Sequence, residues 1–216
     1  MRTPSVFVSS AVVLAATSSL ASAGFTGYSV QRVITAGGNS QYQVFANFDQ
    51  SNLVFLNAFS FVNVSGTMNA RHQDTFTADG EVGTWQAGSS VSAADRPEDS
   101  WVTASGLATS SGWGTALDPG FTNGGTVRDV NNGAGWYDAT PGTANTVTGN
   151  QMLIMQVVRT AAADSVYTAN LSITYKVSGS STPIQPGAFQ YTLGVVPAPG
   201  AVALAGLAGL TGRRRR

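Results

Sequence analysis

Apolar and polar residues alternate along much of the chain, as in β-strands that bury one face. The clearest alternation runs from Val166 to Val177, and Gln41 to Phe48 repeats it. Two other segments, Leu53 to Val64 and Met152 to Val158, are apolar on both faces in places. Such runs predict strands that lie at the centre of a sheet or are covered on both sides.

Weaker signals bring the set to about eight short strands. They lie at Tyr28 to Thr35, Met68 to Phe76, Ser100 to Ser105 and Phe189 to Val195. No segment of the body forms a convincing amphipathic helix, and a sheet with one apolar face must bury that face against another layer. The sequence therefore predicts an all-β fold, an antiparallel β-sandwich of jelly-roll or Greek-key-like type.

The region from Ala104 to Gly149 interrupts this pattern. Glycine, proline and asparagine recur every few residues, from Gly112-Trp113-Gly114 to Pro141-Gly142. A loop region of this length in a compact domain is either functional or a set of short strands that the pattern does not reveal.

The first 23 residues have the organisation of a secretory signal peptide. Arg2 gives a positive start, Val6 to Leu20 is largely apolar, and Ala21-Ser22-Ala23 has the small-x-small form of a signal peptidase site. Cleavage after Ala23 leaves Gly24 as the first residue of the mature chain.

A second targeting signal occupies residues 195–216. Its apolar run is ten residues long, whereas a helix that spans a membrane needs about 20. The arginines behind the run favour a cytoplasmic position for that end. The signal consists of Pro197, Ala198, Pro199 and Gly200, then the run from Ala201 to Leu210, then Arg213, Arg214, Arg215 and Arg216.

This three-part tail resembles the PEP-CTERM sorting signal of exported bacterial proteins, with Ala198 in the place of the family's usual central glutamate. The resemblance covers about a tenth of the chain. It implies that an exosortase, a membrane-embedded cysteine transpeptidase, processes the tail after its short hydrophobic helix has entered the inner membrane. It also implies a location at the cell envelope, outer surface or extracellular matrix, close to exopolysaccharide.

Three segments follow from these signals: a signal peptide at 1–23, a β-sandwich domain at 24–194 and the sorting tail at 195–216. The whole chain has 11 basic and 11 acidic residues, but the body keeps only six of the basic ones and carries a net charge of −5. This charge excludes a broadly basic surface for nucleic acid. The chain has no cysteine, which excludes disulfides, thiolate metal sites and cysteine nucleophiles.

The body offers few catalytic groups. Its single histidine, His72, has no Gly-x-Ser-x-Gly elbow to accompany it and is expected to be a solvated residue at a strand edge. Asp95, Glu98 and Asp99 lie just before Trp101, and glycoside hydrolases use two acids beside the scissile bond. Because neighbours in one polar loop seldom flank a cleft from two sides, a solvated loop is expected and no catalytic residue is assigned.

The sequence predicts no cofactor for the β-sandwich domain, and a bound calcium ion is the alternative. It binds carboxylate and carbonyl oxygens, and the loop acids Asp118, Asp129 and Asp138 add to the three named above. The spaced Asp-x-Asp-x-Asp-Gly loop is absent, and a single histidine excludes a histidine-rich site. The sequence therefore assigns no metal ligand.

The tryptophans Trp85, Trp101, Trp113 and Trp136 all fall in the glycine-rich central third. Trp101, Trp113 and Trp136, with Tyr137, are candidates for stacking on sugar rings, with Asn131, Asn132 and Asp138 as polar partners. The favoured alternative is that at least two of these three indoles fill the core.

The sequence thus predicts an exported structural or adhesive protein at the bacterial surface or in the matrix, processed by signal peptidase and exosortase, rather than an enzyme. A carbohydrate-binding module that contacts exopolysaccharide is the second expectation. A glycan-acting hydrolase that uses Asp95, Glu98 or Asp99 is the third.

Overall fold

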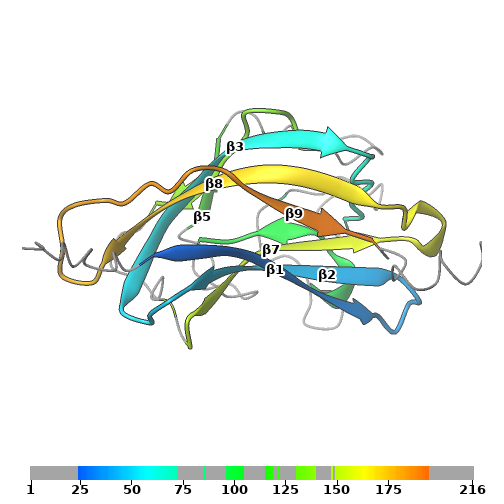
Figure 1. Ribbon diagram of the computed structural model, residues 1–216. Coiled ribbons are helices and arrows are strands. Elements are labelled where there is room, and N and C mark those ends of the chain that lie inside the picture. Colours follow the sequence, from blue (N-terminus) through cyan, green and yellow to red (C-terminus); the bar gives the residue numbers. More distant parts are fainter. Residues whose placement is uncertain are drawn as a thin grey trace, which may run out of the picture.

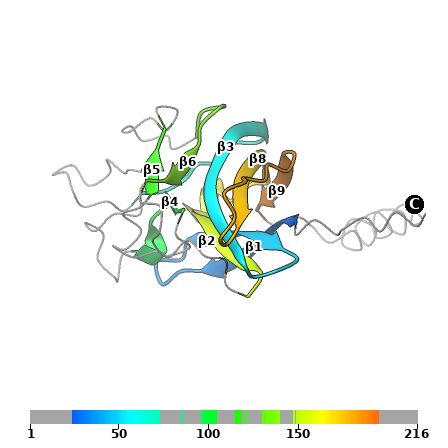
Figure 2. The same cartoon turned by 90° about the vertical axis from the view of Figure 1, so that its left-hand side faces the viewer.

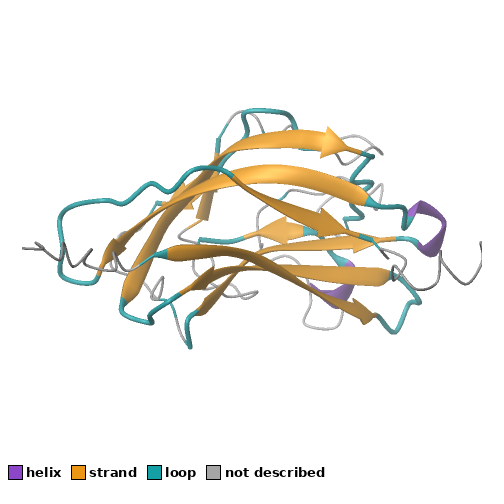
Figure 3. Cartoon of the chain, in the orientation of Figure 1, coloured by secondary structure: helices purple, strands orange, loops and turns teal. Residues whose placement is uncertain are grey.

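The protein folds into two antiparallel β-sheets. The computed structural model describes residues 24–72, 85, 96–104, 115–118, 121, 130–139, 147 and 149–194. The arrangement is shown in Figures 1 and 3. The four-stranded sheet has the order β1 (Phe25–Ile34), β2 (Ser40–Phe48), β7 (Gln151–Arg159), β4 (Trp101–Val102). The five-stranded sheet has the order β5 (Thr115–Leu117), β6 (Trp136–Asp138), β3 (Leu53–Ser65), β8 (Tyr167–Val177), β9 (Phe189–Leu193).

Strands that are distant in sequence pair with each other. β2 pairs with β7 in one sheet, and the strands that follow them, β3 and β8, pair in the other. The chain therefore crosses from one sheet to the other between β2 and β3, and again between β7 and β8, and the two crossings lie side by side. The fold is the expected antiparallel sandwich and not a simple meander. Figure 2 shows the five-stranded sheet lying above β1 and β2.

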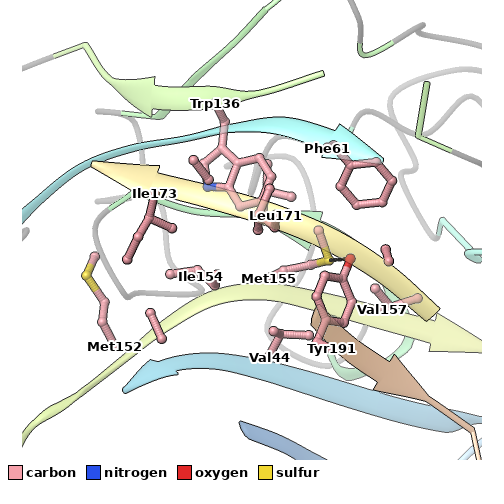
Figure 4. Close-up of a cluster of buried hydrophobic side chains, with 14 of the residues drawn as sticks. Val44, Phe61, Trp136, Met152, Ile154, Met155, Val157, Leu171, Ile173 and Tyr191 are labelled. Atoms are coloured by element: carbon pink, nitrogen blue, oxygen red, sulfur yellow. Dashed lines mark hydrogen bonds between the residues drawn. The ribbon is translucent and has the colours of Figure 1, made fainter. Parts of the chain in front are cut away.

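The core lies between the sheets, and both sheets supply it. Ile154 and Met155 of β7 face Leu171 and Ile173 of β8, and all four side chains are fully buried (Figure 4). Tyr191 of β9 also enters this layer, where its hydroxyl lies 3.6 Å from the sulfur of Met155. Apolar area from two sheets is thereby removed from water, which is the main stabilising term of such a fold.

The strand patterns predicted from sequence match the burial in detail at two places. In β2 the apolar residues of the alternating pattern, Tyr42, Val44, Ala46 and Phe48, are all buried. In β7 both faces are buried, because the segment that contains Arg96–Glu98 covers the side away from the core and receives hydrogen bonds from Gln156. The continuous apolar run therefore indicated a strand covered on both sides, as predicted.

The prediction of a strand at Met68 to Phe76 is wrong for the described part, residues 68–72, which belong to no strand. Met68, Ala70 and His72 are buried alternately, so the period of two reflects an extended segment against the core. Asn69 adopts a φ of 50°, a left-handed conformation that interrupts strand geometry. Likewise, the strand predicted at Ser100 to Ser105 shortens to Trp101–Val102 within the described residues.

The glycine-rich region contains two strands that the sequence pattern did not reveal. β5 and β6 have three residues each, too few for an alternation to be recognised. They pair with each other and extend the five-stranded sheet beyond β3. Helical structure within the described residues is limited to two 3₁₀ turns, η1 (Arg96–Glu98) and η3 (Ala161–Ala163). Over this part of the chain no helix has the length and apolarity needed to cross a membrane.

Candidate functional site

Among the described aromatic residues that the sequence predicts to stack on a ligand, Tyr137 lies at the surface, with a relative exposure of 47%. It follows Trp136, which is buried, so the alternation of β6 turns Tyr137 to the outer face of the five-stranded sheet. Across the sheet it lies opposite Asn57 of β3, and Asn57 lies opposite Thr174 of β8. We call Tyr137, Asn57 and Thr174 the Tyr137 row.

The Tyr137 row combines an aromatic ring with neutral polar groups. Asn57 Oδ1 and Thr174 Oγ1 are both buried and make no hydrogen bond within the protein. Phe59 and Ser172 lie opposite each other in the neighbouring row of the same sheet. The exposed ring of Tyr137 in an uncharged setting suits stacking on the apolar ring face of a neutral ligand, whereas the two buried oxygens are not accessible to that ligand.

The tryptophans have a different environment. Trp101 and Trp136 are each only 1% exposed, which does not fit stacking on a sugar in the bound state. The indole of Trp136 donates to the carbonyl of Thr103 at 3.1 Å. Its ring meets Phe121 edge to face, and Phe121 meets Trp85 in the same way. These rings fill the core, and Trp113 lies outside the described residues.

Glu98 is not a freely solvated loop acid, contrary to expectation. Its carboxylate accepts the Gly37 amide at 2.8 Å and the Asn39 side-chain amide at 2.7 Å, so it braces the turn between β1 and β2. Burial opposes ionisation, but hydrogen bonds from Asn39, Thr35 and Gly37 outweigh it and lower the pKa of Glu98. Asp95, its neighbour in the predicted cluster, lies outside the described residues.

Asp99 and His72 are also placed differently from the prediction, because both are buried. His72 Nδ1 lies 3.6 Å from Asp99 Oδ1, and the imidazole packs edge to face against Trp85. Ser100 does not complete a catalytic triad, because its hydroxyl bonds the backbone of Val158: it accepts the amide at 2.8 Å and donates to the carbonyl at 3.4 Å. The expectation of a solvated His72 and Asp99 is therefore wrong; the two residues belong to the interior beside β4 and β7.

A polar cluster that sequence reasoning missed surrounds Asp164. This carboxylate accepts hydrogen bonds from Arg32 Nη2 at 2.9 Å, Ser40 Oγ at 2.7 Å and the Tyr42 hydroxyl. Burial opposes ionisation here too, but the three donors outweigh it and lower the pKa of Asp164. Arg159, fully buried at the end of β7, lies 3.6 Å from the same carboxylate. The cluster ties the loop before β8 to β1 and β2.

The remaining predicted residues can be placed only in part. Of the calcium candidates, Asp118 follows β5 and Asp138 ends β6, while Asp129 lies outside the described residues. Among the residues that are described, no three acids or histidines come together as a metal site. Asn131 and Asn132 precede β6, where Asn132 Oδ1 accepts the Asn63 amide at 2.7 Å.

The two targeting signals predicted from the sequence, including Ala21, Ala23, Pro197, Pro199 and the terminal arginines, lie outside the described residues, whereas Gly24 is described. Comparison of the chain with protein-family models, curated proteins and solved structures finds no match.

Proposed function

We propose that the protein is an exported, non-enzymatic β-sandwich of the bacterial surface or extracellular matrix, sorted by signal peptidase and an exosortase. One observation carries the proposal: the sandwich occupies the interval between the two signals. β1 begins at Phe25, one residue after the expected mature N-terminus Gly24, and β9 ends at Leu193, just before the tail. A domain bounded in this way needs neither signal for its sheets.

The placement of the polar groups supports a structural role. Glu98 braces a turn, Asp164 ties a loop to two strands, and Ser100 bonds the backbone of β7. Each of these groups satisfies internal donors or acceptors, a role that stabilises loops and leaves less of its hydrogen-bonding capacity for a substrate.

The tail tests the sorting proposal. Replacing Arg213 to Arg216 by serine should impair processing in the natural host, because the arginines orient a helix that is short for a membrane span. Intact mass of the mature protein and its partition between membrane and medium are the measurements. The matched control replaces Arg128, a body arginine, and should change neither. Equal mass and partition in the tail variant and the wild type would contradict the proposal.

A second function, binding of neutral polysaccharide, is favoured by the Tyr137 row. The exposed ring provides the stacking surface, while the oxygens of Asn57 and Thr174 are buried and lie beneath the surface beside it. This proposal replaces the tryptophans of the sequence prediction by Tyr137, because the rings of Trp101 and Trp136 are buried.

Tyr137→Ala should weaken binding of host exopolysaccharide about tenfold, or about 1.4 kcal/mol, while leaving the midpoint of thermal unfolding nearly unchanged. Because an exposed ring contributes little to the core, its loss should change binding without changing the midpoint of thermal unfolding. Val62→Ala is the matched control, because Val62 is 41% exposed and lies opposite Asn170 in the same sheet. Saturable binding that Tyr137→Ala leaves intact would reject this site.

A further inference from the structure

The first residue of the described domain is fixed to the end of β2 by two hydrogen bonds. The Gly24 nitrogen donates to Asp49 Oδ1 at 2.8 Å, and the Asp49 amide donates to the Gly24 carbonyl at 3.0 Å. Gly24 precedes the first residue of β1, and Asp49 follows the last residue of β2. The Asp49 carboxylate thus accepts the hydrogen bond that a backbone carbonyl would accept if the pairing of β1 with β2 continued by one residue.

The next residue is fixed more firmly. The Phe25 amide donates to the Tyr175 hydroxyl at 3.0 Å, and the Phe25 ring is buried edge to face against Tyr28 and Phe189. The Gly24 nitrogen is therefore held at hydrogen-bond distance from a carboxylate by the contacts of the Gly24 carbonyl and of Phe25, the residue that follows. A charge placed on that nitrogen would meet Asp49 without rearrangement of the backbone.

We propose that Asp49 is the receptor for the mature N-terminus, binding the α-ammonium group that signal peptidase creates on Gly24. Hydrolysis of the Ala23–Gly24 bond consumes one water: its hydroxyl goes to the Ala23 carbonyl carbon and its proton to the Gly24 nitrogen. The free amine takes a second proton from solvent at neutral pH. The neutral hydrogen bond to Asp49 becomes an ion pair at the same 2.8 Å contact.

Two consequences follow. Cleavage stabilises the folded domain, because the contact gains charge while its geometry stays the same. Cleavage also precedes the docking of β1. A peptidase must bind the chain on both sides of the scissile bond, and in the folded domain Gly24 and Phe25 are already bonded to Asp49 and Tyr175. The inference depends on the proposed signal-peptide processing.

A chemical double-mutant cycle tests the proposal on the mature chain from Gly24 to Arg216. The four samples are wild type and Asp49→Asn, each with a free and an Nα-acetylated Gly24, and the measurement is urea unfolding at low ionic strength. Acetylation should raise the unfolding equilibrium constant of the wild type about two- to fivefold, the range of exposed ion pairs, and that of Asp49→Asn much less. The difference should shrink in 1 M NaCl.

An NMR titration of Gly24 gives a readout that a merely structural Asp49 would not move. The pKa of the α-amine should be higher in the wild type than in Asp49→Asn, and Asp49→Glu should restore part of the difference. Equal acetylation effects in both backgrounds, or equal amine pKa values, would overturn the role of Asp49. Intact mass of the exported protein separately tests processing: a mature N-terminus other than Gly24 would overturn the cleavage site.

Discussion

At the scale of single residues, the carboxylates of Glu98 and Asp164 hold loops against neighbouring strands. Asp164 shows this best, because its side chain is only 8% exposed and three donors from β1 and β2 converge on it. The donors favour the ionised form over the protonated form. The folded state therefore binds a proton at Asp164 less readily than the unfolded state does.

This difference predicts how stability depends on pH. The pKa of Asp164 is lower in the folded state than in the unfolded chain, where it is about 4. The stability that ionised Asp164 contributes is therefore fully present above the unfolded-state pKa, and it is lost as pH falls through the folded-state pKa. Asp164→Asn should cost about 2 kcal/mol of unfolding free energy at pH 7 and progressively less below pH 4. Urea unfolding of both proteins between pH 3 and 7 measures the difference.

Two comparisons make this result specific to Asp164. Tyr42→Phe removes one donor to the carboxylate and should show a smaller pH-dependent loss. Glu98→Gln should show a loss of the same sign, because the pKa of Glu98 is also lowered. A difference between wild type and Asp164→Asn that stays constant from pH 7 to pH 3 would contradict the assignment of the charged form as the stabilising one.

At the scale of elements, the sequence predicts long strands well and short ones poorly. β8 alternates over most of its length, and its inward positions, Tyr167 to Tyr175, are buried as the pattern requires. β5 and β6 have three residues each, so neither is long enough for an alternation with a period of two to be recognised. Their existence depends on pairing with β3, a contact between distant segments that no local signal carries.

Irregular backbone has the same effect within a long strand. In β3 the register with β8 shifts three times, and Ser60 adopts a φ of 52°. Within the shift between Phe59 and Val62, Phe61 is buried in the core, and Val62 at its end is exposed. The sequence pattern therefore identified β3 as a central strand but could not assign each side chain to a face, since a bulge changes the assignment from that point on.

The candidate site also has one part that the sequence predicts and one part that only the sheet order reveals. The burial of Trp101 and Trp136 follows from the size and apolar area of the indole, which a sequence argument can weigh. The Tyr137 row, in contrast, joins residues from three strands that are about 80 and 40 positions apart in the chain. Only sheet order brings Tyr137, Asn57 and Thr174 into one line. The Asp164 cluster and the Gly24–Asp49 contact escaped prediction for the same reason.

At the scale of the whole molecule, the two sheets share one core, and the last strand is part of it. β9 contributes Tyr191 and Leu193, which are 3% and 0% exposed, and it pairs with β8 along its full length. The rings of Tyr28 and Tyr191 also meet edge to face, which joins the edge strands of the two sheets. A cooperative unit should therefore need β9 but neither of the two terminal segments that are predicted to be targeting signals.

Residues 24–194 expressed alone should give a β-type circular dichroism spectrum and one cooperative thermal transition, because every described strand lies within them. The matched control, residues 24–188, lacks β9 and exposes the core that Tyr191 and Leu193 cover, so it should melt without a sharp transition or fail to fold. Adding residues 195–216 back to 24–194 should shift the midpoint little, since the last described strand ends at Leu193. A non-cooperative melt of 24–194 that the tail restores would show that the tail belongs to the folded unit, and would contradict both the domain boundary and the role of the tail as a sorting signal alone.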